Sequence, residues 1–92
     1  MVEIRDIEIM EVDIHRFYVL EAKNYLERLL VNIPFEIKEV KVIHGWRRGT
    51  ALRDMVRNEL QNSRIKRRFI SLNPGVTSLI LSTCFEEEKR RY

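Results

Sequence analysis

Segments with a strand-like hydrophobic pattern alternate along the chain with segments that have a helical one. Strict alternation of apolar and polar residues is typical of strands, whereas repeats of three and four residues are typical of helices with one buried face. Helical repeats run from Val19 to Ile33, where Pro34 ends them, and run again over about 51–61. The strand-like segments are 7–14, 39–44, 64–72 and 76–85.

The order of these elements, β-α-β-α-β-β, predicts an α/β fold. Strands that alternate with helices form parallel β-α-β units, whereas the last two strands, joined by the Asn-Pro-Gly turn at 73–75, should pair antiparallel. Segment 76–85 is the more apolar of these two and should lie more centrally. We expect a two-layer sandwich of a four-stranded mixed sheet and two helices. The pattern leaves open whether both helices cover the same face.

The 92 residues are enough for one domain with a modest core. We place this domain at 1–85 and expect a charged tail at 86–92, whose acidic and basic residues are spaced as in a helical turn. No other domain precedes the fold, so the sequence predicts a stand-alone unit.

Cysteine use and hydropathy bear on the compartment. Cys84 is the single cysteine, so no internal disulfide can form, which fits a reducing environment. No apolar run approaches the roughly 20 residues that span a bilayer, and the acidic N-terminus does not resemble a signal peptide. We therefore expect a cytoplasmic protein with no membrane partner. Its oligomeric state is left open.

The charge of the chain is unevenly distributed. Residues 1–43 hold six Lys/Arg and nine Asp/Glu, whereas residues 44–92 hold eleven and five; within 44–68 the counts are eight and two. A basic segment of this kind suits a polyanion such as nucleic acid. A solvated basic surface with no partner would have the same composition.

Candidate chemistry lies at the ends of the first two strands. Asp13 and His15 share one side of their strand, and a carboxylate beside an imidazole can set its tautomer and raise its basicity. His44 ends the second strand. If the two strands are parallel, these side chains meet at the edge where open α/β sheets bind ligands. The simpler alternatives are a turn-forming aspartate and a buried histidine bonded to backbone.

The loop after His44 reads Gly45, Trp46, Arg47, Arg48, Gly49 and Thr50. Its glycines permit close backbone approach, and Thr50 is a candidate N-cap of the helix that follows. Helix N-termini and arginines both suit phosphate, and an exposed tryptophan can stack on an unpaired base. The loop matches neither a Walker A motif nor a dinucleotide fingerprint. The alternative is a solvated arginine loop with its tryptophan in the core.

Further basic residues extend this loop. Arg53 and Arg57 are four residues apart, so they should share one helix face. Alternation should place Arg64, Lys66 and Arg68 on one face of the third strand. These strand charges could equally protect an edge strand from pairing. Two histidines and one cysteine in no metal-ligand spacing define no zinc site, so we expect no cofactor, although a divalent metal stays open.

Three motifs together resemble the Smr (small MutS-related) domain family. "VDIH" resembles its Leu-Asp-Leu/Val-His signature, "VIHGWRRGTALRDMVRNEL" its second signature, and "NPGVTSLIL" its closing turn and strand. The resemblance covers residues 12 to 82 in the family's order. It implies an α/β sandwich like the C-terminal domain of a bacterial initiation factor, nucleic-acid binding, and in many members endonuclease activity on DNA or RNA, in some cases at stalled ribosomes.

By this resemblance, Asp13 and His15 correspond to the residues required for cleavage. His44, Gly45 and Gly49 correspond to the backbone-binding loop. The sequence departs from the family at two places: Arg16 replaces a glycine that usually follows the first histidine, and the loop lacks its middle glycine and is one residue longer.

The sequence thus predicts an endonuclease, acting on RNA more than on DNA, in which His15 is the general base, Asp13 orients it, His44 completes the catalytic set, and the loop with Arg53 and Arg57 holds phosphate. A non-catalytic nucleic-acid or ribosome-binding module is the alternative. A site for a small phosphorylated ligand ranks third.

Overall fold

The computed structural model describes residues 2–4, 9–34, 36–47 and 49–82. The strands are β1 (Val2–Ile4), β2 (Ile9–Asp13), β3 (Glu39–Ile43), β4 (Ile65–Ile70) and β5 (Val76–Leu81). Helix α1 spans Val19–Asn32, and helix α2 spans Ala51–Asp54 and continues as a π-helical segment, η1, over Met55–Glu59. Cys84, Arg48 and the tail predicted at 86–92 lie outside the described residues.

The predicted α/β fold is confirmed, with a four-stranded mixed sheet, two helices and the order β-α-β-α-β-β from β2 onward. Strand β2 pairs parallel with β3, β3 pairs antiparallel with β5, and β5 pairs antiparallel with β4. The more apolar strand, β5, is internal to the sheet as expected. The short strand β1, which the sequence pattern did not predict, adds a fifth strand antiparallel to β2 at the edge.

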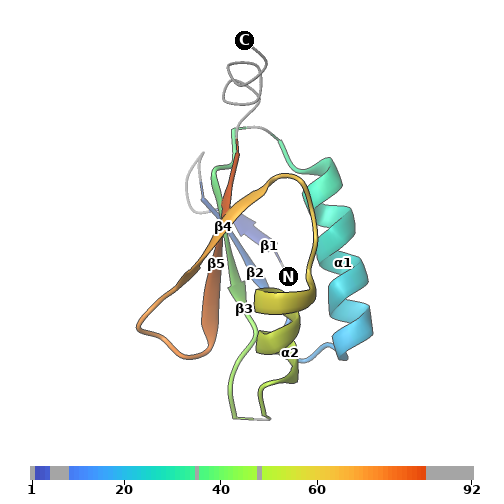
Figure 1. Cartoon of the computed structure of the whole chain (residues 1–92), viewed down its shortest axis with the longest axis vertical. Helices are drawn as coiled ribbons and strands as arrows, with labels where there is room; N and C mark the ends of the chain where they lie inside the picture. Colours follow the sequence, from blue (N-terminus) through green and yellow to red (C-terminus); the bar gives the residue numbers. More distant parts are fainter. Residues whose placement is uncertain (1, 5–8, 35, 48, 83–92) are drawn as a thin grey trace.

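Both helices cover the same face of the sheet and contact each other, so the molecule has two layers (Figure 1). This settles the question that the pattern left open. Alternate residues of β2, β3 and β5 point into the interface between the layers, and three residues of α1 reach them from the other side. The buried set is Met10, Val12, Ile14, Ala22, Leu26, Leu30, Ile33, Ile37, Val40, Val42, Met55, Val56, Leu60, Leu79 and Leu81.

The third predicted strand differs from its expected pattern. A bulge between Ile65 and Arg67 interrupts the alternation, so Arg64, Lys66 and Arg68 do not form one basic face. The Arg68 guanidinium donates from Nε to the Val56 carbonyl (2.8 Å) and from Nη2 to the Leu60 carbonyl. Val56 lies within η1 and Leu60 caps its carboxyl end, and the carbonyls of the last turn of a helix have no helical partner.

Arg64 has a similar role at the end of α1. It is 8% exposed, and its Nη1 donates to the Ile33 carbonyl at 2.6 Å, while Nη2 lies 3.5 Å from the carbonyls of Pro34 and Ser82. Two of the eight basic residues of segment 44–68 therefore donate to backbone carbonyls. The charge count alone overstates the basic surface that a ligand can reach.

Candidate nucleic-acid site at the ends of strands β2 and β3

The site lies at the carboxyl ends of the parallel strands β2 and β3. The connections that leave these strands, and the turn between β4 and β5, gather at the same end of the molecule (Figure 1). Pairing continues past the strands, because the Ile14 amide donates to the Ile43 carbonyl at 2.9 Å. A Cβ atom placed on Gly45 would lie 3.4 Å from the Cβ of His15, so the two sequence motifs are in contact.

Gly75, in the turn before β5, holds the start of the loop in place. Its carbonyl accepts hydrogen bonds from the amides of His44 (2.9 Å) and Gly45 (3.1 Å). A Cβ at this position would come within 3.3 Å of the Gly45 Cα and 3.2 Å of the Trp46 ring. A side chain here would therefore be crowded by the loop, and the "NPG" turn belongs to the architecture of the site.

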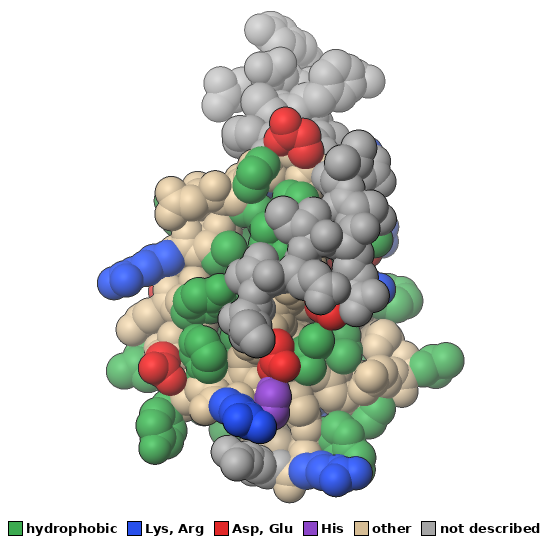
Figure 2. All heavy atoms as spheres, turned by 180° about the vertical axis from the view of Figure 1, so that it is seen from behind, with side chains coloured by type: hydrophobic (Ala, Val, Ile, Leu, Met, Phe, Trp, Pro, Cys, Tyr) green, Lys and Arg blue, Asp and Glu red, His purple; other side chains and the backbone are tan. Residues whose placement is uncertain are grey.

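Asp13 and His15 form a hydrogen-bonded pair on the surface. Asp13 Oδ1 accepts from the His15 backbone amide at 3.0 Å and also contacts the His15 ring at Nδ1. The side chain of His15 is 44% exposed and that of Asp13 is 36% exposed. An exposed histidine is visible between acidic and basic side chains on the face of the molecule drawn in Figure 2. The predicted juxtaposition of these two residues is thus present.

Opposing effects act on the Asp13 carboxyl. Partial burial raises its pKa, but hydrogen bonds from the His15 ring and amide, with the nearby imidazole charge, outweigh this and leave the pKa below its usual value. The carboxylate is therefore ionised at neutral pH and can only accept. Nδ1 of a neutral His15 must carry its proton, which leaves Nε2 as the basic nitrogen.

His44 has a different environment, because it is 3% exposed and both of its ring nitrogens are bonded. Nδ1 lies 2.8 Å from the Gly45 carbonyl and Nε2 lies 2.9 Å from Thr77 Oγ1. Arg57 Nε donates to the same hydroxyl oxygen at 3.0 Å. The three hydrogen bonds are consistent with one assignment of donors. Arg57 donates to the Thr77 hydroxyl, this hydroxyl donates to Nε2 of His44, and Nδ1–H of His44 donates to the Gly45 carbonyl.

The protonated form of His44 is disfavoured. Burial lowers its pKa below the ordinary 6.5, the Gly45 carbonyl acts in the opposite direction, and the charges of Arg57 and Arg53 lower it further. A neutral imidazole with both nitrogens occupied is suited to positioning the loop. This environment matches the simpler alternative that the sequence left open, a buried histidine bonded to backbone. The geometry gives no support to the predicted catalytic role of His44.

The loop itself combines two special glycines with an arginine and a tryptophan. Gly45 and Gly49 have φ values of +74° and +104°, which other residues rarely adopt. Trp46 is 54% exposed, and the Arg47 guanidinium carbon lies 5.7 Å from the centroid of its ring. A cation over an indole ring at this distance is a stabilising contact. Trp46 is thus at the surface and available for stacking rather than in the core.

Thr50, Arg53 and Arg57 are engaged by neighbouring groups. Thr50 is at the N-cap position of α2, but its hydroxyl donates to the Asp54 carboxylate at 3.0 Å instead of accepting from a helix amide. Asp54 also accepts from Arg53 at 3.2 Å, and Arg57 bonds Thr77. The Asp54 carboxylate occupies the first turn of α2, where a phosphate would have to compete with it.

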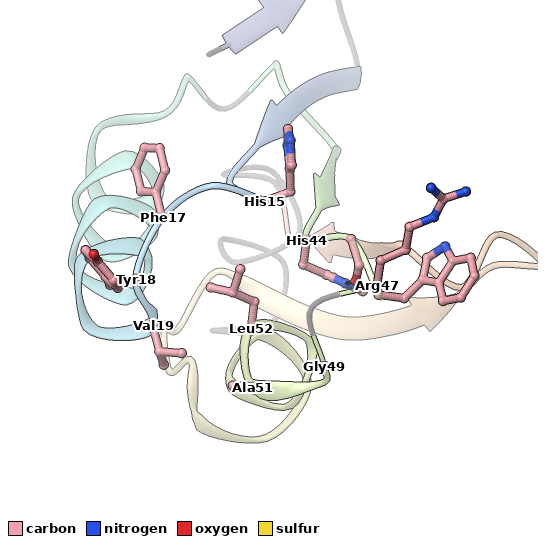
Figure 3. Close-up of a pocket in the computed structure, with 11 residues that line it drawn as sticks. His15, Phe17, Tyr18, Val19, His44, Arg47, Gly49, Ala51 and Leu52 are labelled. Atoms are coloured by element: carbon pink, nitrogen blue, oxygen red, sulfur yellow. Dashed lines mark hydrogen bonds between the residues drawn. The ribbon is translucent and has the colours of Figure 1, made fainter.

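An apolar pocket of about 520 Å³ opens beside these groups. Figure 3 shows Phe17, Tyr18 and Val19 on one side of it, Ala51 and Leu52 of α2 below, and Arg47 on the far side. The remaining residues that line it are His15, His44, Gly45, Trp46 and Gly49. The pocket is where small side chains, at Gly45, Gly49 and Ala51, leave the space between the loop and α1 unfilled.

The walls of this pocket are the part of the site that was not predicted. Phe17 and Tyr18 come one residue after the Asp13–His15 motif, and this aromatic pair was the available signal. Phe17 is held edge-to-face against Tyr25, with ring centroids 5.5 Å apart, and Tyr18 is 85% exposed. Their contribution depends on how α1 packs, which local sequence patterns do not reveal.

Within the described ranges, no three of His, Cys, Asp and Glu come together in a way that could hold a metal ion. In the same ranges, no helix has the length and apolar character needed to cross a membrane. Comparison of the chain with models of protein families, with curated proteins and with solved structures gave no match.

Proposed function

We propose that this protein binds nucleic acid at the rim formed by β2, β3 and the Gly45–Gly49 loop, and that it cleaves RNA there. The observation that carries the proposal is the pairing of Asp13 with His15 at a pocket that Trp46 and Arg47 also line. A base, a cation and a stacking surface thus meet around one cavity. The resemblance to the Smr domain family supports the same assignment.

In the proposed reaction, Nε2 of His15 removes the proton from a ribose 2′-hydroxyl. The 2′-oxygen bonds to the adjacent phosphorus, the bond from phosphorus to the 5′-oxygen breaks, and the leaving oxygen takes a proton from water. Asp13 holds the imidazole through Nδ1, and a general base of this kind contributes about 10²–10⁴-fold to a rate. The products are a 2′,3′-cyclic phosphate and a 5′-hydroxyl.

Arg47 supplies the charge that this reaction needs. Its guanidinium lies beside Trp46, and among the described residues its only recorded interaction is with that ring. A guanidinium can donate two hydrogen bonds to a phosphate and stabilise the additional negative charge of the transition state. We place the reaction in the cytoplasm, where RNA is available.

The test is incubation of the protein with end-labelled RNA and with DNA of the same sequence, each with and without chelator. We expect RNA cleavage that resists chelation, because a 2′-hydroxyl nucleophile needs no metal. His15→Ala and Asp13→Ala should both lose it. Glu36→Ala is the matched control, since Glu36 is an exposed acid before the amino end of β3, at the opposite end from the site. Equal cleavage by His15→Ala and the control would refute the proposal.

One observation favours a second candidate, a binding module without catalysis. A general acid for the leaving oxygen would be expected in an efficient ribonuclease, and His44 cannot serve because both ring nitrogens are bonded. This candidate predicts salt-dependent binding without products. Arg47→Ala should then weaken binding and flatten its salt dependence, while Arg67→Ala, at an exposed arginine of β4, should leave both unchanged.

A further inference from the structure

The pocket beside His15 is larger and more apolar than phosphate binding requires. Phosphate is held by charged groups and backbone amides, whereas Phe17, Val19 and Leu52 offer only hydrocarbon. A volume of about 520 Å³ is in the range of pockets that hold whole small molecules, roughly 300–1,000 Å³. The nucleic-acid rim therefore includes a cavity whose chemistry suits a flat apolar group.

The pocket is also preformed. Phe17 is fixed by its ring contact with Tyr25 and by its amide, which donates to the Ile14 carbonyl at 2.9 Å. On the opposite wall, the loop is fixed by the two hydrogen bonds that Gly75 accepts. A rigid cavity with aromatic residues at its edge binds with little ordering cost.

We propose that this pocket receives the base of one unpaired nucleotide of an RNA strand, with the ribose of that nucleotide against His15. The inference rests on the proposed function and names its substrate class. Unpaired bases are recognised by stacking on aromatic side chains and by burial in pockets, and a base inside a duplex could not enter. His15 and Arg47 line the same cavity, so the sugar and phosphate of a seated nucleotide lie next to both.

This arrangement selects single-stranded or bulged RNA. In the proposed reaction the 2′-hydroxyl of the seated nucleotide attacks the phosphate on its own 3′ side, so scission falls on the 3′ side of the unpaired nucleotide. A fully paired duplex can contact Arg47 with its phosphates but cannot fill the cavity. Preference for unpaired nucleotides thus follows from the pocket, whereas general affinity follows from charge.

Ala51→Phe is the variant that isolates the pocket. Ala51 is exposed at the start of α2 and lines the cavity, so a phenyl group there fills the space without entering the core. Ala51→Ser at the same position keeps the cavity open and is the matched control. Asp13, His15 and Arg47 are unchanged in both.

The experiment is a double-mutant cycle on binding. Affinities of the unmodified protein, Ala51→Ser and Ala51→Phe are measured by fluorescence anisotropy for an RNA hairpin with a single-nucleotide bulge, the same hairpin with an abasic bulge, and the fully paired hairpin. Stacking of one base corresponds to roughly a tenfold change in affinity. We expect removal of the base to weaken binding about tenfold in the unmodified protein and in Ala51→Ser, and not at all in Ala51→Phe.

Each outcome decides between the claims. Equal affinity for bulged, abasic and paired RNA would overturn the pocket proposal and leave nucleic-acid binding intact. Absence of RNA binding would overturn both. Tight binding of free nucleoside monophosphates without preference for the bulged hairpin would also overturn it, in favour of a small-ligand site. A positive cycle in a protein that does not cleave would support the pocket and refute only the cleavage step.

Discussion

The two histidines of this protein end neighbouring parallel strands, yet they occupy opposite environments. His15 follows β2, is half exposed and lies at the edge of a pocket. His44 follows β3, is buried and has both nitrogens bonded. Strand geometry explains the difference, because successive residues point to opposite faces. His44 continues the buried series Val40 and Val42, whereas His15 lies one position past the buried Ile14.

The comparison shows that the face of the sheet to which a strand-end histidine points decides whether its side chain is buried or exposed. A side chain that points between the sheet and the helices is buried and helps to hold the loop. A side chain that points away from the helices stays accessible to a ligand. We therefore propose that the chemistry takes place around His15 and that His44 positions the loop. Four substitutions or conditions would break or sharpen this division.

The largest expected effect is on activity at His15. His15→Ala should lower the rate of RNA cleavage by about 10²–10⁴-fold, because it removes the proposed general base. Its free energy of unfolding, measured in urea, should stay close to that of the parent since the side chain is exposed. A large loss of stability would show that His15, like His44, is a structural residue.

His44→Ala should have the converse result. The substitution removes a buried side chain and leaves the Thr77 hydroxyl, which Arg57 still donates to, without its acceptor, so we expect a loss of about 2–3 kcal/mol of unfolding free energy. The midpoint of urea unfolding measures this at constant slope. A fully stable variant that has lost only activity would place His44 among the catalytic groups and end the distinction.

Gly45→Ala tests the contact between the two regions. Forcing alanine to the observed φ of +74° should cost about 1 kcal/mol of stability, and the added methyl group would reach His15. We expect weaker cleavage than stability alone explains. Gly49→Ala is the matched control, because Gly49 also has positive φ but a methyl group there meets no atom within 4 Å. Identical cleavage by the two variants would exclude coupling through Gly45.

The smallest effect concerns pH. The folded state lowers the pKa of His44, so the unfolded chain binds a proton first as pH falls below 6.5. The contribution of neutral His44 to stability is complete above this pH and is lost as pH falls through the lower folded-state value. Unfolding free energy should therefore decline between pH 7.5 and 5.5, and His44→Gln should make this decline shallower. An unchanged slope in the variant would contradict the assignment.

Local pattern was sufficient for much of the fold. Alternation and helical repeats identified four strands and both helices, and the apolar character of 76–85 indicated that β5 is internal. Strand β1 was missed because three residues are too few to establish a period. The basic face expected on β4 was wrong, because a bulge at Ile65 and Arg67 breaks the alternation from which it was inferred.

By itself, the sequence determined the order of elements and, through the parallel pairing of β2 and β3, that Asp13, His15 and the loop after His44 would meet. These features depend on local backbone geometry and on connection rules, which are properties of short segments. Only the tertiary structure decided which arginines support backbone, as Arg64 and Arg68 do, and which histidine is buried. The tertiary structure also decided that the residues at the start of α1 and α2 leave a cavity beside His15. Burial and empty space depend on how distant segments pack, and no short segment carries that information.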